Sequence, residues 1–402
     1  MSDRPGRIVV VGGGQAALAF VAKARSLDPA VNLLIVGEEE VAPYQRPPLS
    51  KAYLSGELPL DRLLLRDAAW YADNRIEWLG GQRVARIDRK AAQVETVKGE
   101  SIAYDALLLA TGARARGLPA AIRGELPNVL SMRTIGDADA LAPYLRQGGS
   151  MLLVGGGYIG LEAAAVARTA GVSVVLLEAA MRILGRVASE DTADYYRDLH
   201  RAYGVDIREA AALSELTMGG GVLADGSQLA ADVTVVGIGV APNTELAAQA
   251  ALPVKDGIVV DEYCRTADPR IMAVGDCANF PHRGRRVRLE SVPHAIHHAE
   301  TAATNLLGEP EAYDAKPWFW SDQYDVKLQI AGLNDGYERT VVRPGRRPGS
   351  QSVWYYRGDT LLAVDAMNDA PAFMTARRLI EAGRSVPSAD AADPARALRD
   401  FV

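Results

Sequence analysis

Ile8-Val9-Val10-Val11-Gly12-Gly13-Gly14-Gln15-Ala16-Ala17 stands near the start of the chain, and Met151-Leu152-Leu153-Val154-Gly155-Gly156-Gly157-Tyr158-Ile159-Gly160 repeats its pattern further on. In each stretch an apolar run typical of a buried strand ends in a glycine motif, and an alanine-rich segment typical of a helix follows. A strand, a tight glycine turn and a helix in this order bind the diphosphate of a dinucleotide. Two such motifs in one chain predict two dinucleotide sites.

The small residues of each motif have separate tasks. We expect Gly12 to make the sharp turn after the strand and Gly14 to admit the diphosphate to the free N–H groups of the helix. Ala17 is small enough for the helix to lie close to the strand. In the second motif, which follows the pattern more strictly, these tasks fall to Gly155, Gly157 and Gly160.

Each unit also supplies an acidic residue where a ribose would bind. The second apolar run of the first unit ends in Glu38, and that of the second unit ends in Glu178. An acid about 20 residues after the glycines can accept hydrogen bonds from ribose hydroxyls. This context favours two real dinucleotide sites over two incidental glycine turns.

The bulk composition is that of a soluble globular protein. The 402 residues, of which 49% are hydrophobic and 23% charged, suffice for two or three domains with separate cores. A formal net charge of -6 argues against a general nucleic-acid binder. The first residues are polar, unlike a signal peptide, and no apolar run approaches the roughly 18 residues of a membrane span. We therefore expect a cytoplasmic protein with neither nucleic-acid nor membrane partners.

Cysteine and histidine are the residues that would carry sulfur or metal chemistry. The two cysteines, Cys264 and Cys277, form no Cys-x-x-Cys pair, and we interpret both as small buried apolar residues. His294, His297 and His298 crowd one predicted helix, where the first and last have the spacing of two metal ligands. Because no acids or cysteines are spaced to complete a set, we interpret them as structural and predict no metal site.

The order of the predicted elements indicates an α/β protein with two Rossmann-like domains, the second inserted into the first, and a C-terminal α+β domain. A small antiparallel sheet is expected from Trp78 to Tyr104, and short strands from about Ser321 begin the last domain. The expected limits are 1–116 and 243–320 for the first dinucleotide domain, 117–242 for the second and 321–402 for the C-terminal domain.

Several motifs together resemble the FAD-containing, NADH-dependent ferredoxin reductases of bacterial oxygenase systems, the putidaredoxin reductase type within the glutathione-reductase-like flavoproteins. The resemblance covers essentially the whole chain. Its most specific parts are Arg46-Pro47-Pro48-Leu49-Ser50-Lys51, Gly155-Gly156-Gly157-Tyr158-Ile159-Gly160-Leu161-Glu162, Ala273-Val274-Gly275-Asp276-Cys277-Ala278, Glu290-Ser291-Val292-Pro293 and Trp318-Phe319-Trp320-Ser321-Asp322-Gln323.

By this resemblance the first dinucleotide domain holds FAD and the second binds NADH. The implied NADH contacts are Gly155, Gly157, Gly160 and Glu178. The implied FAD contacts are Gly12, Gly14 and Ala16 at the pyrophosphate, Glu38 at the adenosine ribose, Val84 at the adenine, Arg133 beside the domain crossing, Asp276 on the ribityl chain, Val292 near the flavin ring and Lys51 near its reactive edge.

The resemblance also implies three residues beside the reacting centre. The sequence itself predicts that Ser50 caps a helix after the paired prolines, where a lysine such as Lys51 can be aimed inward. The family suggests that Lys51 pairs with Glu162, and that Trp320 sits at the flavin face and at the edge of the partner surface. A plain core role for Trp318 and Trp320 is the alternative.

The implied function is electron transfer from NADH through FAD to a 2Fe-2S ferredoxin that supplies a monooxygenase or an aromatic-ring dioxygenase, by a monomer or weak homodimer. FAD can take two electrons as a hydride and release them singly. Positions 39 to 60 hold no cysteine, which counts against a disulfide reductase or a cysteine-dependent oxidase. A rubredoxin reductase, or a flavoprotein with a mainly binding or signalling role like apoptosis-inducing factor, remains an alternative.

Glu178 also predicts which pyridine nucleotide binds. A 2'-phosphate about 4 Å from this carboxylate would meet a repulsion of about 4 kcal/mol at an effective dielectric of about 20. Since about 1.4 kcal/mol is tenfold, even half of that repulsion favours NADH over NADPH by more than an order of magnitude.

Two basic clusters stand out in an acidic chain. The first is the run from His282 to Arg288, and the second comprises Arg343, Arg346 and Arg347. They are either solvated loop surface or a docking site that attracts an acidic ferredoxin by charge.

Overall fold

The computed structural model describes residues 4–401, which form two compact units. Unit 1 comprises the residues up to Gln45 together with Pro59–Arg114 and Ala241–Lys316. Unit 2 comprises Arg46–Leu58, Ala115–Val240 and the residues from Pro317 onward. The chain thus leaves unit 1 and returns to it twice, leaving first for the short segment Arg46–Leu58 and then for Ala115–Val240.

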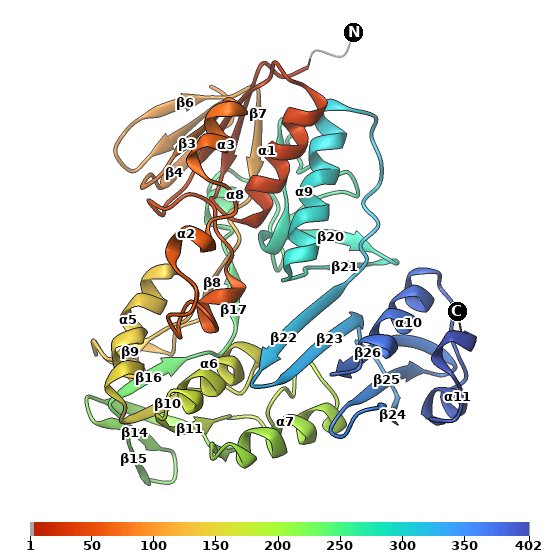
Figure 1. The fold of residues 1–402 in the computed structure, drawn as a ribbon. Helices are drawn as coiled ribbons and strands as arrows, with labels where there is room; N and C mark the ends of the chain where they lie inside the picture. Colours follow the sequence, from red (N-terminus) through yellow and green to blue (C-terminus); the bar gives the residue numbers. More distant parts are fainter. Residues whose placement is uncertain (1–3, 402) are drawn as a thin grey trace. The chain divides into compact units, whose positions relative to one another are not determined.

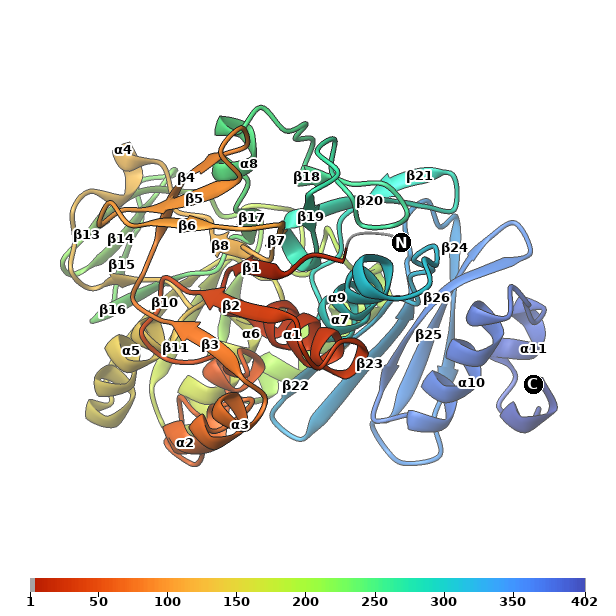
Figure 2. The same ribbon diagram turned by 90° about the horizontal axis from the view of Figure 1, so that it is seen from above.

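Unit 1 is built on a five-stranded parallel sheet in the order β19 (Ile271–Ala273), β7 (Ala106–Leu109), β1 (Arg7–Val11), β2 (Asn32–Val36) and β3 (Ile76–Leu79). The helices α1 (Gln15–Leu27) and α9 (Val292–Leu307) lie side by side against it (Figures 1 and 2). The central strands are almost wholly apolar because both faces of the sheet are covered. The chain runs from β1 to β2 on one side and later to β7 on the other, so the carboxyl end of β1 is the point where strand order reverses.

The antiparallel sheet predicted from Trp78 to Tyr104 begins later than expected. It consists of β4 (Val84–Asp88), β5 (Gln93–Thr96) and β6 (Ser101–Ala103). Trp78 itself belongs to β3, which pairs in parallel with β2 through Ile35. The edge strand β3 is short and only partly buried, so its sequence pattern does not show whether it belongs to the parallel or to the antiparallel sheet.

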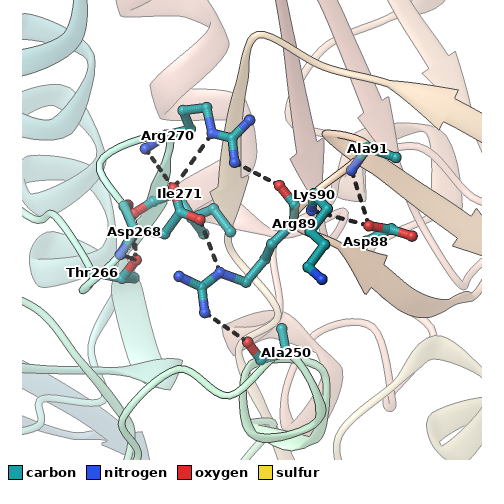
Figure 3. A network of polar contacts seen from close by, with 9 residues as sticks. All are labelled: Asp88, Arg89, Lys90, Ala91, Ala250, Thr266, Asp268, Arg270 and Ile271. Carbon is teal, nitrogen blue, oxygen red and sulfur yellow. Dashed lines mark hydrogen bonds and ion pairs between the residues drawn. The ribbon is translucent and has the colours of Figure 1, made fainter.

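Within unit 1, a polar network connects the part of the chain before Ala115–Val240 with the part that follows it (Figure 3). The Arg89 guanidinium, at the β4–β5 turn, donates from Nε to Asp268 Oδ2 at 2.9 Å and from Nη1 to the Ala250 carbonyl at 3.1 Å. Arg270 Nε lies 3.5 Å from Asp268 Oδ1. Burial alone would raise the pKa of Asp268, but the hydrogen bond from Arg89 and the charges around it lower that pKa overall. Unit 1 therefore closes on itself although its sequence is interrupted.

Unit 2 contains a second five-stranded parallel sheet, in the order β12 (Asp206–Arg208), β11 (Ser173–Leu177), β10 (Ser150–Val154), β16 (Val233–Val236) and β9 (Val129–Leu130). Its main helices are α5 (Ile135–Gln147), α6 (Tyr158–Thr169) and α7 (Glu190–Ala202). As in unit 1, the strand that carries the glycine motif lies between the strand that follows it and a strand reached much later. The two sheets repeat one topology.

The C-terminal part of unit 2 is an antiparallel sheet in the order β22 (Trp318–Gln323), β23 (Val326–Gly332), β26 (Thr360–Met367), β25 (Gln351–Arg357) and β24 (Arg339–Pro344). The helix α10 (Ala370–Glu381) packs on it, as Figure 1 shows. Trp354, Val364 and Phe373 are buried in the shared core. This is the predicted α+β module, with β22 as an added edge strand.

The remaining elements are short. They are α2 (Leu60–Leu63), α3 (Ala68–Asp73), α4 (Ala120–Arg123), α8 (Glu245–Gln249), α11 (Ser388–Ala392), β8 (Ala113–Ala115), β13 (Leu213–Thr217), β14 (Gly220–Leu223), β15 (Gln228–Ala230), β17 (Val240–Pro242), β18 (Ile258–Val259), β20 (Ala278–His282), β21 (Arg285–Val287) and the 3-10 turns Pro47–Ser50, Gly275–Cys277 and Leu398–Phe401. Among residues 4–401, no helix has the length and apolarity needed to cross a membrane.

Candidate dinucleotide and electron-transfer site

The first glycine motif has the geometry that its sequence predicts. Gly12 has φ +115°, and a Cβ at this position would lie 2.2 Å from the carbonyl oxygen of Ala110. Only glycine fits this turn, because both the backbone angle and the neighbouring strand exclude a side chain. Ala17 is fully buried in α1. The helix therefore starts directly at the carboxyl edge of the sheet.

The second motif repeats this arrangement in unit 2. A Cβ at Gly155 would lie 2.5 Å from the Gly237 carbonyl oxygen, and one at Gly160 would lie 2.2 Å from the Gly155 carbonyl oxygen. The latter contact shows why the third position is a glycine here: α6 passes against the turn itself. In the first motif Ala17 fills the same position.

The N termini of α1 and α6 are open in the way a diphosphate requires. Gly14 and Gly157 are the N-cap residues, and as glycines they have no side chain that could accept from the first N–H groups of the helix. Neither helix has an acid in its first turn. A Cβ on either glycine would meet nothing within 4 Å. Free N–H groups, the positive end of the helix dipole and open space thus coincide at both places. The residues present fit the diphosphates of FAD and NADH.

Glu178 is held beside the second motif. Its Oε2 accepts from the Gly156 N–H and its Oε1 from the Ala180 N–H, both at 2.8 Å. Glu38, its counterpart in unit 1, is exposed, with its nearest guanidinium atom, Arg83 Nε, 4.0 Å away. The two predicted ribose acids therefore differ: one is fixed by the backbone and the other is not.

Among the other predicted FAD residues of unit 1, Asp276 lies next to a glycine that approaches the first motif. Gly275 follows β19 and approaches Ala16, since a Cβ on Gly275 would lie 3.3 Å from the Ala16 Cβ. Asp276 comes next in the chain, within the turn Gly275–Cys277 rather than as a capping residue. Val292 is the first residue of α9, and Val84 is buried at the start of β4.

Lys51 and Glu162 form an ion pair in unit 2, with Nζ 2.8 Å from Oε2. The Glu162 side chain is 6% exposed and that of Lys51 is 19% exposed. Ser50 Oγ donates to Glu162 Oε2 and Ser321 Oγ donates to Oε1, each at 2.7 Å. Ser50 is therefore not the helix cap that its sequence context predicts, because its hydroxyl binds a carboxylate from another segment.

The segment before Lys51 is anchored beside Arg133. Arg46 Nη1 donates to the Arg133 carbonyl at 2.8 Å, and the Arg133 N–H donates to Asp137 at the start of α5. Arg133 and Lys51, both predicted to contact FAD, thus belong to one connected part of unit 2.

The strand β22 separates its side chains onto two faces. Phe319 packs on Tyr158 of α6 with ring centroids 5.3 Å apart, and Ser321 on the same face reaches Glu162. Trp318 and Trp320 lie on the other face with centroids 5.5 Å apart, both partly exposed. Trp320 is therefore placed at a surface, whereas Trp318 also packs on Phe373 of α10.

Both cysteines are buried and unpaired, as predicted. Burial raises the pKa of Cys264 and of Cys277, which disfavours the thiolate form that redox and metal chemistry need. His294 and His298 are buried in an aromatic cluster with Phe280 and Tyr313, and desolvation lowers the pKa of His294 to about 3. Among residues 4–401, no group of three or more acids, histidines and cysteines is placed to hold a metal ion.

The second basic cluster is smaller than predicted. Arg343 is buried, and its guanidinium donates to the carbonyl oxygens of Ala391, Asp393 and Arg396. It holds the C-terminal segment in place and is not available for docking. In the first cluster, the Arg286 guanidinium donates to the Val260 carbonyl, and Arg288 pairs with Asp256 and Glu290, so both bind within unit 1.

Sequence reasoning missed Trp78, whose indole lies against the backbone of the first motif. A Cβ on Gly13 would lie 2.7 Å from its ring and one on Gly37 would lie 2.1 Å away. Glycine at position 37, just before the predicted ribose acid, was the available signal. Ser321, by contrast, carries no signal of its role, because its partner Glu162 is remote in the sequence.

Comparisons with known proteins agree with this geometry. The family model of pyridine nucleotide-disulphide oxidoreductases matches residues 6–299, and that of a reductase C-terminal domain matches residues 318–402. Rhodocoxin reductase of Rhodococcus erythropolis is 42% identical over 393 residues, which cover 96% of this chain and 92% of that protein. Putidaredoxin reductase of Pseudomonas putida is 41% identical over 384 residues, which cover 93% of this chain and 91% of that protein.

Among solved structures, a chain in the crystal structure of the covalent putidaredoxin reductase–putidaredoxin complex matches with a TM-score of 0.95 and 39% identity. The match covers 100% of this chain and 98% of that one. The predicted fold class and the predicted resemblance are both confirmed.

Proposed function

The chain belongs to the pyridine nucleotide-disulphide oxidoreductase family, and from this we propose that it passes electrons from NADH through FAD to a 2Fe-2S ferredoxin that supplies an oxygenase. The observation that carries the proposal is the pair of open, glycine-capped helix N termini, one in each parallel sheet. The buried cysteines support direct passage of electrons without a thiol step.

When bound, FAD takes the electron pair of a hydride and gives up electrons one at a time. The residues of this chain bind and orient the two dinucleotides. The N–H groups at the start of α1 hold the FAD diphosphate, and those at the start of α6 hold the NADH diphosphate. Glu178 accepts from the NADH ribose. Lys51, fixed by Glu162, is the positive group expected at the reactive edge of the flavin.

The partner is the finer part of the proposal. The relatives named rhodocoxin reductase and putidaredoxin reductase are named for the protein that each reduces. We propose that a small iron-sulfur protein is the electron acceptor here. We place the reaction in the cytoplasm, and we expect a monomer or weak homodimer to carry it out. The proposed FAD domain comprises residues 1–116 and 243–320, and the proposed NADH domain comprises residues 117–242. The C-terminal domain comprises residues 321–402.

Trp320 tests the partner surface. We expect Trp320→Ala to slow ferredoxin reduction by at least about tenfold, as loss of a buried tryptophan anchor does, and to leave flavin reduction by NADH nearly unchanged. Stopped-flow absorbance under anaerobic conditions measures the two steps separately. Trp318→Ala is the matched control, since Trp318 shares the strand and face but packs on α10. Slower flavin reduction with unchanged ferredoxin reduction would reject the assignment.

A further inference from the structure

Glu162 is the end point of a continuous row of hydrogen bonds in unit 2. Gln323 Nε2 donates to Ser321 Oγ at 3.1 Å, and Ser321 Oγ donates to Glu162 Oε1. On the far side, His200 Nε2 lies 2.8 Å from Gln323 Oε1, and the Tyr324 hydroxyl lies 3.3 Å from His200 Nδ1. The following four residues are called the donor chain: Tyr324, His200, Gln323 and Ser321.

The donor chain can be polarised in one direction only. Ser321 has a single hydroxyl proton, which the Glu162 carboxylate needs, so Ser321 must accept from the Gln323 amide nitrogen. The Gln323 oxygen then faces His200 Nε2, which must carry the imidazole proton. His200 Nδ1 is left as an acceptor, and Tyr324 donates to it. Every donor points toward the carboxylate, and hydrogen bonds in such a row strengthen one another.

The donor chain is also buried and fixed. His200, Gln323 and Ser321 have no exposed surface, and desolvation lowers the pKa of His200 to about 4, so the neutral ring persists at neutral pH. Two segments supply the donor chain, α7 and the β22–β23 hairpin, and Glu162 comes from a third, α6, which packs against β22 (Figure 1). The row of hydrogen bonds therefore depends on how these segments pack against one another.

Tyr324, at the outer end of the donor chain, is held in an unfavourable backbone conformation. It stands in the two-residue turn between β22 and β23 with φ 53°, in the left-handed region that bulky residues avoid. Its ring stacks on Tyr203 with centroids 3.7 Å apart and planes within 6°. A residue kept in this conformation is fixed by its surroundings, here by the stack and the bond to His200.

We propose that the donor chain positions the Glu162 carboxylate, and through it the Lys51 ammonium, as a device that tunes the FAD site. Its members are positioning residues, since none is expected to touch a cofactor. The inference that the tuned group lies at the flavin rests on the proposed function. The polarity of the chain does not.

The tautomer of His200 tests the polarity directly. The chain has five histidines, so [15N]histidine-labelled protein gives few signals, and His200→Gln assigns the relevant one. Long-range 15N–1H spectra should show the proton on Nε2 alone. Tyr324→Phe, which keeps the ring and removes one hydroxyl, should shift the Nδ1 resonance, whereas the control Tyr203→Phe should not. A proton on Nδ1, or no shift in Tyr324→Phe, overturns the proposal.

Ser321 tests the positioning role in the FAD-loaded protein. We expect Ser321→Ala to slow flavin reduction by NADH by at least about threefold and to shift the midpoint potential of the flavin, because a hydrogen bond to a charged group is lost. Ser321→Thr keeps the hydroxyl and should restore both values. Ser352→Ala removes a buried hydroxyl in the same sheet, one that accepts from Trp354, and should change neither.

The outcomes separate the two hypotheses. If Ser321→Ala binds FAD with unchanged rate and potential, the positioning role is wrong. If Ser321→Ala does not fold, Tyr324→Phe gives the same comparison from the outer end, with a smaller change in the same direction. If the wild-type protein binds FAD but NADH does not reduce it, the proposed function and the tuning role both fail, while the histidine spectra still decide the polarity of the chain.

Discussion

We expect Glu178 to be the residue that selects the pyridine nucleotide. Two backbone N–H groups fix its carboxylate beside the second glycine motif, so it cannot swing away from a 2'-phosphate without losing both bonds. We expect catalytic efficiency with NADH to exceed that with NADPH by at least about tenfold, and Glu178→Gln to reduce this ratio several-fold. Steady-state kinetics with both cofactors measures it. Glu215→Gln, at an exposed position of β13, is the control. Equal efficiency with both cofactors in the wild type would contradict the role.

Lys51 and Glu162 form the second residue-scale test. Removing one partner of a buried pair leaves an uncompensated charge, so Lys51→Met should lower the free energy of unfolding by about 3 kcal/mol. The double variant Lys51→Met/Glu162→Gln should be more stable than the sum of the single changes predicts, since it strands no charge. Denaturant unfolding of all four proteins gives the coupling. Strict additivity would mean that the pair does not interact in solution.

At the scale of the element, a substitution at a helix N terminus can distinguish an effect on folding from an effect on FAD binding. A Cβ on Gly14 meets open space, so Gly14→Ala should leave the stability of the FAD-free protein within about 0.5 kcal/mol of wild type. FAD affinity should fall at least about tenfold, because the methyl group would occupy the place that we propose for the diphosphate. Thermal melting and flavin fluorescence titration measure the two effects.

Gly12→Ala is the contrasting variant. Its Cβ would collide with the Ala110 carbonyl, so this change should destabilise the protein even without FAD. Equal FAD affinity in Gly14→Ala and wild type would show that the diphosphate does not bind at the start of α1.

At the scale of the whole molecule, buried histidines make the fold sensitive to acid. Desolvation lowers the pKa of His200 to about 4 and that of His294 to about 3, from an ordinary value of 6.5, and lowers the pKa of His298 as well. The unfolded chain therefore binds more protons as the pH falls below 6.5. The stability that these groups contribute is complete above that pH and is lost toward pH 4.

Asp365 acts in the opposite direction. Burial raises the pKa of this carboxyl to about 6, so its contribution to stability falls as the pH rises from 4 to 6. Burial also lowers the pKa of His282, so the histidines outweigh the one aspartate and the melting temperature should decline between pH 6.5 and 4. His200→Gln should make that decline shallower, and Asp365→Asn should make it steeper. A melting temperature that is constant over this range would contradict the assignment.

A feature of the fold or the site could be predicted from the sequence where the residues that form it lie close together along the chain. The glycine motifs and Glu178 are local, because a strand, a turn and a helix carry the whole signal within one unit. The partners of Glu162 are not local: Ser50 and Ser321 lie 112 and 159 positions away, so only the folded chain brings them together. The burial of Arg343 was missed for the same reason, since its acceptors are carbonyl oxygens of the C-terminal segment.

The most direct test is an anaerobic titration of the purified protein, first with NADH and then with a 2Fe-2S ferredoxin, followed by absorbance. We expect a yellow protein whose flavin band bleaches on addition of one equivalent of NADH and recovers as two equivalents of ferredoxin are reduced, with or without a thiol-blocking reagent. A protein that cannot be loaded with FAD, or a loaded flavin that NADH does not bleach, would contradict the proposed electron path.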